Sequence, residues 1–225
     1  MNHFKGTQSK KDVNIVDVGN YLRKNLSYRV VRELLFERGI HACYTTIYRW
    51  VQEYSKFFYD LWIKQNTQSV FIGKWTKPIF KIKGRWHYLY RVIEADGLTL
   101  YICLQIRRDT QAAYAFLKRL SKLFGESKAI VIDKSLYLGS TYKKLQSMGL
   151  YTKEHRTVKI FNKLIEQDHR PFKRRNNFYQ SYRTASYTIK GMETLRRIYK
   201  KNRRNGTLFG FAVSTEIKVL IRITA

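Results

Sequence analysis

Apolar residues recur at helical spacing in three stretches near the start of the chain. The first stretch covers about residues 13–22. The second begins after Ser27, a good N-cap, and ends at Gly39, a residue that commonly terminates helices. A third helix is expected from Tyr44 or Thr45. Two helices joined by a short glycine-containing turn make a helix-turn-helix, although a plain helical hairpin has the same pattern.

The third helix carries an inner and an outer face. Ile47, Trp50, Val51 and Tyr54 recur at helical spacing and are expected to face inward. The second helix of a helix-turn-helix enters the major groove of DNA with its first residues foremost. The candidate DNA-binding residues left on the outer face are Thr45, Thr46, Tyr48, Arg49 and Gln52.

The pattern changes from helical to alternating further along the chain. Residues 58–70 are polar and without a clear period, so we place a domain boundary there. Three β-rich runs follow at about residues 79–82, 86–93 and 98–106, with hairpin signals between them. Residues 110–124 then form an amphipathic helix.

Two carboxylates lie at the ends of predicted elements. The apolar run at residues 129–132 reads as a buried strand that ends at Asp133. A helix around residues 142–148 and a short strand near 150–151 follow, and Glu166 lies near the start of another helix. In a very basic chain such a pair suggests a Mg²⁺ site acting on a phosphodiester, because hard cations prefer oxygen ligands. Two surface carboxylates are the simpler interpretation of the pattern alone.

Charge narrows the choice of partner. The 225 residues include 44 Lys and Arg against 16 Asp and Glu, which gives a formal net charge of +28. This favours a polyanion such as nucleic acid. No apolar run approaches the ~20 residues that span a membrane, and the polar start of the chain has no signal-peptide pattern. Cys43 and Cys103 are expected to be buried thiols in a reducing compartment.

Residues 162–175, together with Asp133, resemble the second half of the DDE motif in transposases of small bacterial insertion sequences. The resemblance covers nearly the whole chain and is also carried by residues 1–6, 45–52 and 206–211. It implies an α/β protein in three parts. These are an N-terminal all-α helix-turn-helix in residues 1–60, a ribonuclease H-like mixed-sheet catalytic core in residues 70–185, and a C-terminal helix with a basic tail in residues 186–225.

The resemblance also implies the site. Asp133 would be the second acidic residue and Glu166 the third, both ligands of Mg²⁺ or Mn²⁺. Lys173 would be the basic partner on the Glu166 helix, and Lys173, Arg174 and Arg175 would contact the phosphate backbone. The partners implied are terminal inverted repeats and target DNA, bound by a homo-oligomer in the bacterial cytoplasm, at the nucleoid.

The first acidic residue of the motif is missing. The family pattern has a segment resembling Trp-Lys-Met-Asp-Glu-Thr-Tyr-Ile where this chain has residues 73–80, and Thr76 occupies the aspartate position. Reading TGG AAA ATG GAC GAA ACC TAT ATT without its first base gives Gly-Lys-Trp-Thr-Lys-Pro-Ile, as found here. Our hypothesis is that roughly residues 70–80 are translated out of frame, with a compensating shift on either side.

Three functions follow from these observations. The first is a transposase that binds the ends of an insertion sequence and performs Mg²⁺-dependent cleavage and transfer of DNA strands. The second is a catalytically dead DNA-binding remnant that occupies the same ends. The third is an RNA-binding or nuclease-like module that uses the same fold.

Overall fold

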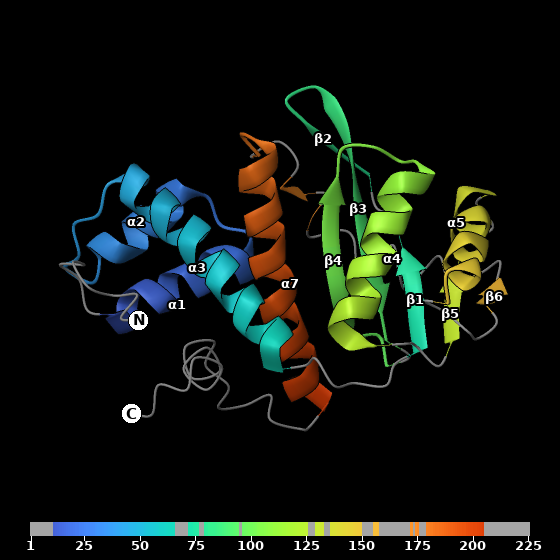
Figure 1. The fold of residues 1–225 in the computed structure, drawn as a ribbon. Helices are drawn as coiled ribbons and strands as arrows, with labels where there is room; N and C mark the ends of the chain where they lie inside the picture. Colours follow the sequence, from blue (N-terminus) through green and yellow to red (C-terminus); the bar gives the residue numbers. More distant parts are fainter. Residues whose placement is uncertain are drawn as a thin grey trace. The chain divides into compact units, whose positions relative to one another are not determined.

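The computed structural model divides the chain into two compact units, residues 1–62 with 183–225, and residues 63–182 (Figure 1). The residues that it describes are 11–65, 72–76, 79–94, 96–125, 129–132, 136–149, 155–157, 172, 174–175 and 179–204. Within these ranges, none of the helices has both the length and the apolar character needed to cross a membrane.

Helices alone make up the described part of the first unit. They are α1 (Lys11–Lys24), α2 (Tyr28–Phe36), α3 (Tyr44–Gln65) and α7 (Tyr182–Arg204). The predicted start and stop signals are confirmed, because the Ser27 hydroxyl accepts a hydrogen bond from the Val30 amide at 3.3 Å and Gly39 adopts a φ of 73° after α2. The amide of Ile40 donates to the Leu35 carbonyl at 2.9 Å, which completes a glycine-terminated helix end.

The prediction of a polar connector in residues 58–70 is wrong over its first half. Helix α3 continues to Gln65. Phe58, Tyr59 and Trp62 are buried along it, so this stretch has an apolar face that its polar residues conceal in the sequence.

Helix α7 supplies the surface that covers this part of α3. Lys190 lies 5.0 Å from the ring centre of Tyr59, and Arg197 lies 5.1 Å from that of Trp62. At Gly191 the two helices approach closely, since a Cβ there would lie 2.6 Å from the Ser55 hydroxyl. The C-terminal helix, expected as a separate part, therefore packs within the helical unit (Figure 1).

The second unit is built on a mixed sheet. Its strands are β1 (Ile72–Thr76), β2 (Ile79–Ile82), β3 (Arg85–Ile93), β4 (Thr99–Gln105), β5 (Ala129–Ile132) and β6 (His155–Thr157). β3 pairs antiparallel with β1, β2 and β4. β5 is parallel to both β1 and β6. The three predicted β-rich runs and the strand before Asp133 are confirmed, whereas the strand predicted near residues 150–151 lies outside the described residues.

β1 and β2 pair with the same edge of β3 in one register. Thr76 pairs with Arg91, and Ile79 pairs with Tyr88, which is the same register against β3 on both sides of residues 77–78. The strand order is therefore β4, β3, the combined β1 and β2, β5 and β6. Three antiparallel strands followed by two parallel ones give the mixed sheet of the predicted ribonuclease H-like fold.

Helix α4 (Thr110–Phe124) covers one face of this sheet, with the bounds predicted from the sequence. Its N-cap Asp109 accepts from the Ala112 amide at 2.7 Å. The Phe116 ring lies 5.5 Å from that of Tyr90 and 5.3 Å from that of Tyr101. Beside α4 runs α5 (Leu136–Ser147), which begins earlier than predicted.

The opposite face is covered by side chains from the end of the unit. The Arg91 guanidinium lies 5.9 Å from the ring centre of Phe172. The Tyr182 hydroxyl donates to the Leu104 carbonyl at 2.6 Å, and its ring lies 5.8 Å from that of His87. Both faces of the sheet are thus covered around Tyr90 and Arg91.

Candidate active site and nucleic-acid interface

The strand that holds position 76 is parallel to the strand that precedes Asp133 in the sequence. Lys74 of β1 pairs with Val131 of β5, and β1 ends at Thr76 just as β5 ends at Ile132. Asp133 follows Ile132 in the sequence but lies outside the described residues, as do Glu166 and Lys173. Ligands of open α/β sheets bind outside the carboxyl ends of such strands, and Thr76 lies at the carboxyl end of β1.

A buried cation lies across from this position. Arg91, the partner of Thr76 in the ladder, is fully buried. Its Nε and Nη2 donate to the Thr99 hydroxyl at 3.0 and 2.6 Å. The residue opposite Thr76 is thus a guanidinium held in place by two hydrogen bonds.

Position 76, among the described residues of this edge, lacks the carboxylate that a two-metal site requires. Shared carboxylates hold the metals of such sites, and Thr76 offers a neutral hydroxyl instead. Glu94 and Asp96 stabilise the turn between β3 and β4, where the Asp96 carboxylate accepts from the Leu98 amide at 2.9 Å. Over the described ranges, no three His, Cys, Asp or Glu side chains are grouped as metal ligands.

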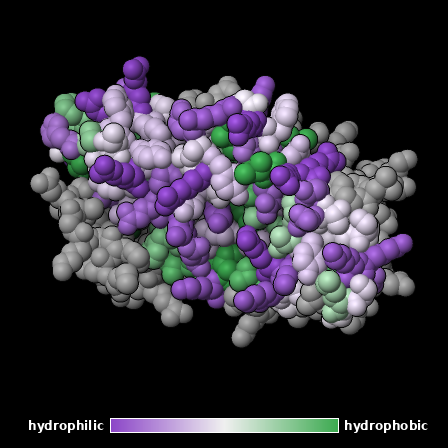
Figure 2. Space-filling model, turned by 45° about the horizontal axis from the view of Figure 1, so that its top comes forward, coloured by the Kyte–Doolittle hydropathy of each residue, from purple (hydrophilic) through white to green (hydrophobic). Residues whose placement is uncertain are grey.

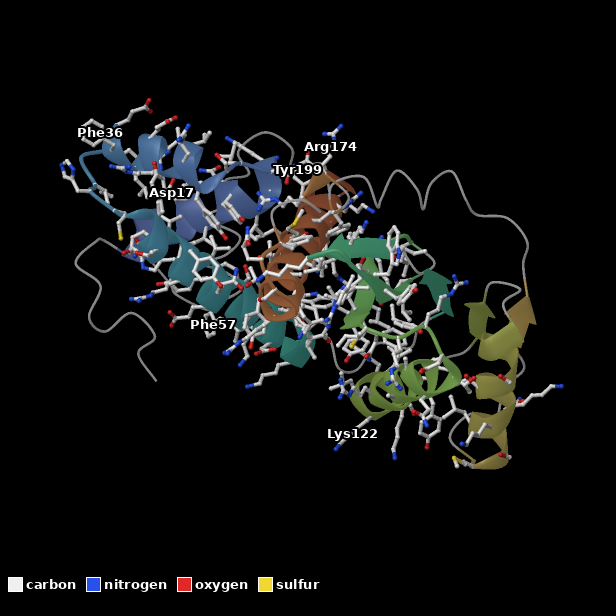
Figure 3. The ribbon with its side chains drawn as sticks, turned by 90° about the horizontal axis from the view of Figure 1, so that it is seen from above. Asp17, Phe36, Phe57, Lys122, Arg174 and Tyr199 are labelled. Atoms are coloured by element: carbon white, nitrogen blue, oxygen red, sulfur yellow. The ribbon has the colours of Figure 1, made fainter. Side chains whose placement is uncertain are left out.

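The two described members of the predicted phosphate-contacting run differ in exposure. Arg174 is exposed (Figure 3). Arg175 has 2% of its surface exposed, and its amide donates to the Phe172 carbonyl at 3.2 Å. Arg175 is thus buried, and its predicted contact with the phosphate backbone stays a prediction.

Helix α3 has the predicted inner face. Ile47, Trp50, Val51 and Tyr54 are buried. Thr45 and Arg49 are exposed, as an element that enters a DNA groove requires.

Two of the predicted DNA-reading side chains turn toward α7 instead. The Tyr48 hydroxyl and the Thr184 hydroxyl lie 3.1 Å apart and share a hydrogen bond. The Gln52 amide donates to the Thr188 hydroxyl at 3.2 Å. Both side chains thus connect α3 to α7, a contact that we did not predict, while Tyr48 remains 37% exposed.

The two cysteines are less buried than predicted. Cys43 is exposed and Cys103 is partly exposed, and both are free thiols. Cys43 precedes α3, and its sulfur lies 3.0 Å from each of the Thr45 and Thr46 hydroxyls. Hydrogen bonds from Thr45 and Thr46 lower the pKa of the Cys43 thiol to about 6.

A basic cluster on α2 was not predicted. The Arg32 guanidinium donates to the Tyr44 hydroxyl at 3.0 Å, and its hydrogen bond lowers the pKa of Tyr44. Arg29 also acts on Tyr44, and all three side chains are exposed at the start of α3. Their helical spacing on the polar face of α2 was the available signal. Figure 2 shows hydrophilic side chains over much of one face of the molecule.

The second unit has the mixed sheet expected from the sequence, and in the first unit a short glycine-containing turn joins α2 to α3. A family model described as a DDE domain matches residues 77–202. The transposase for insertion sequence-like element IS431mec of Staphylococcus aureus is 43% identical over 222 residues, which are 98% of this chain and 99% of that protein. The transposase for insertion sequence element IS257 in transposon Tn4003, also from Staphylococcus aureus, has the same identity and coverage. The chain therefore belongs to the DDE transposase family of bacterial insertion sequences.

Among solved structures, the magnesium-bound catalytic core domain of HTLV-2 integrase in its trimeric form is similar, with 15% identity and a TM-score of 0.45. The similarity covers 57% of this chain and 86% of that domain.

Proposed function

We propose that this chain is a transposase that binds the ends of an insertion sequence, and that Thr76 disables strand cleavage and transfer in this copy. The observation that carries the proposal is the register of the combined β1 and β2 strand. It keeps position 76 opposite Arg91 and beside β5, with no slip that would bring a different residue to the same place. The family match also begins at position 77, directly after Thr76.

Asp133 and Glu166 would be the two remaining acidic ligands of Mg²⁺ or Mn²⁺. When bound, the metal would promote attack of water, and then of a freed 3′-hydroxyl, on a phosphodiester. A threonine hydroxyl supplies neither the negative charge nor the bridging geometry of a carboxylate. We therefore assign no metal-dependent step to the chain in its present sequence.

DNA recognition is assigned to the helical unit. Thr45 and Arg49 would reach base edges from the start of α3, while Arg29 and Arg32 on α2 would contact phosphates. The partners are the terminal inverted repeats and the target DNA in the bacterial cytoplasm, at the nucleoid, and a homo-oligomer would hold paired ends. Lys173 and Arg174 would contact the backbone from the catalytic unit.

Repair of the acidic segment tests this function. Residues 73–80 are replaced by Trp-Lys-Met-Asp-Glu-Thr-Tyr-Ile, and strand transfer is measured in vitro with Mg²⁺ and element ends. The repaired chain should transfer strands, and a further Glu166→Ala change should abolish the activity. If the unmodified chain already transfers strands, the assignment of Thr76 is wrong.

Thr76 also favours a second candidate, an inactive protein that occupies the ends and excludes an active transposase. Gel shifts with terminal repeats, random duplex and RNA distinguish the possibilities. Both DNA functions require preference for the repeats, whereas an RNA-binding module would show none.

A further inference from the structure

β2 and β3 form a hairpin that extends the central strand. Lys83 and Gly84 close it with φ values of 47° and 77°, the two positive values that a type I′ turn requires. The tip of the hairpin projects beyond the ends of β4 and α4 (Figure 1).

The two faces of this hairpin differ. Phe80 and His87 on one face are buried and anchor it to the domain. On the other face Lys81 lies directly across from Trp86, with its ammonium 5.5 Å from the ring centre. Trp86 is 58% exposed and Ile79, two residues from Lys81, is 42% exposed. Large apolar side chains are thus presented to solvent by a strand pair whose other face is packed.

The charge around these side chains has one sign. Lys81, Lys83 and Arg85 are exposed, and no Asp or Glu occurs anywhere in residues 79–93. Cations that follow a phosphate backbone, combined with an aromatic ring on which a base stacks, are the features by which proteins bind single strands. In a duplex the faces of the bases are hidden, so an exposed indole selects unpaired bases.

We propose that the β2–β3 hairpin is a second nucleic-acid-binding site, distinct from the helix-turn-helix, and that it binds DNA with unpaired bases. Trp86 stacks on a base, while Lys83 and Arg85 contact the phosphates on either side of it. The site lies in the second unit and does not depend on an intact acidic motif.

Fluorescence anisotropy of the full chain with a labelled single strand of about 12 nucleotides tests the proposal. Trp86→Ala should weaken binding about tenfold, whereas Trp86→Phe, which keeps an aromatic ring, should retain most of the affinity. Phe36→Ala is the matched control, because Phe36 is an exposed ring on α2 in the other unit and its loss should leave single-strand affinity unchanged.

Charge and stacking are tested separately. A Lys83→Ala and Arg85→Ala double variant should reduce the slope of log affinity against log salt by ~1.4. Lys122→Ala with Lys143→Ala removes the same charge from exposed positions on α4 and α5 and should leave the slope unchanged. Binding of the strand should also quench tryptophan fluorescence in the unmodified chain, and Trp86→Phe should lose this quenching.

Several results would overturn the proposal. One is unchanged single-strand affinity in Trp86→Ala. Another is an equal loss on duplex, which would make the hairpin a general backbone contact. A third concerns the oligomeric state of Trp86→Ala, measured by light scattering. If the unmodified chain is an oligomer and the variant is a monomer that still binds the strand, this face is a contact between copies of the chain. The proposed function is tested by a different variant, because it makes preference for terminal repeats depend on Arg49. Failure of the hairpin proposal and failure of the proposed function are therefore seen separately.

Discussion

Thr76 lies directly opposite Arg91 in the antiparallel ladder between β1 and β3. Residues opposite each other in such a ladder share a face, with Cβ atoms ~4.5–5.5 Å apart. A carboxylate at position 76 is therefore expected beside a buried guanidinium.

This relationship predicts that Thr76→Asp stabilises the domain without restoring much activity. Hydrogen bonds to charged groups contribute ~1.5–3 kcal/mol, and a double-mutant cycle with Arg91→Met, measured by urea unfolding, should show coupling of this order. Strand transfer should remain low, because Lys77 adds a positive charge and Pro78 removes a ladder donor. A coupling near zero would show that the two side chains do not interact.

Arg49→Ala should weaken binding to terminal repeats by about 1–3 kcal/mol if Arg49 contacts a base. Tyr48→Phe is the comparison, because it removes a hydroxyl that bonds to Thr184 and should alter stability rather than sequence preference. Titrations with terminal repeats and with random duplex measure the loss of affinity for each. Equal weakening on both would make Arg49 a backbone contact.

Lys173→Ala combined with Arg174→Ala should make DNA binding less sensitive to salt. Two lost phosphate contacts reduce the slope of log affinity against log salt by ~2. Titrations at several salt concentrations measure the slope. An unchanged value would place this run away from DNA.

Gly191→Ala should destabilise the helical unit. The new Cβ would lie 2.6 Å from the Ser55 hydroxyl and 2.9 Å from a Leu22 methyl group, and such overpacking costs ~1–3 kcal/mol. Gly139 on α5 is the control, because nothing lies within 4 Å of its added Cβ. Gly139→Ala should instead stabilise by about 1 kcal/mol. Thermal unfolding of both variants tests the pair.

The burial of Asp17 predicts that the stability of the helical unit depends on pH. Burial raises the pKa of Asp17 above its ordinary 3.8, although Arg38, at 2.8 Å, acts in the opposite direction (Figure 3). The folded chain thus binds this proton more tightly than the unfolded chain. The stabilising contribution of protonated Asp17 to the free energy of unfolding is fully present below pH 3.8. It is lost as the pH rises through the raised pKa.

Urea unfolding from pH 3 upward measures this effect. Asp17→Asn should flatten the profile in that window, and Asp60→Asn, which removes an exposed carboxylate from α3, should leave it unchanged. An unaltered profile in Asp17→Asn would contradict the assignment.

Local signals predicted α4 in full, because its apolar spacing and Gly125, which ends it, lie within a single stretch of sequence. They failed for the end of α3. Tyr59 and Trp62 are buried there beside Lys190 and Arg197, which are far away in the chain. The orientations of Tyr48 and Gln52 were missed for the same reason. A helix pattern shows which side chains share a face, but it does not show that a distant helix covers part of it.

For the acidic motif, the resemblance gave assignments that the described residues do not test. The resemblance assigned Asp133, Glu166 and Lys173 to roles, yet these residues lie outside the described ranges, so their roles stay predictions. The resemblance also assigned the first acidic position to Thr76, and the structure adds that this residue lies opposite Arg91 at the end of β1. The burial of Arg91 had no signal in the sequence, because arginines in strands usually read as surface residues.

The same register of β1 and β2 against β3 separates inheritance of the fold from inheritance of the chemistry. Selection that acts on folding or on occupation of DNA ends does not detect the loss of one carboxylate from a strand that still pairs correctly. If the proposed loss of activity at position 76 holds, a copy of this kind would act in a cell through occupation of DNA ends, and its effect would depend on its abundance rather than on its turnover.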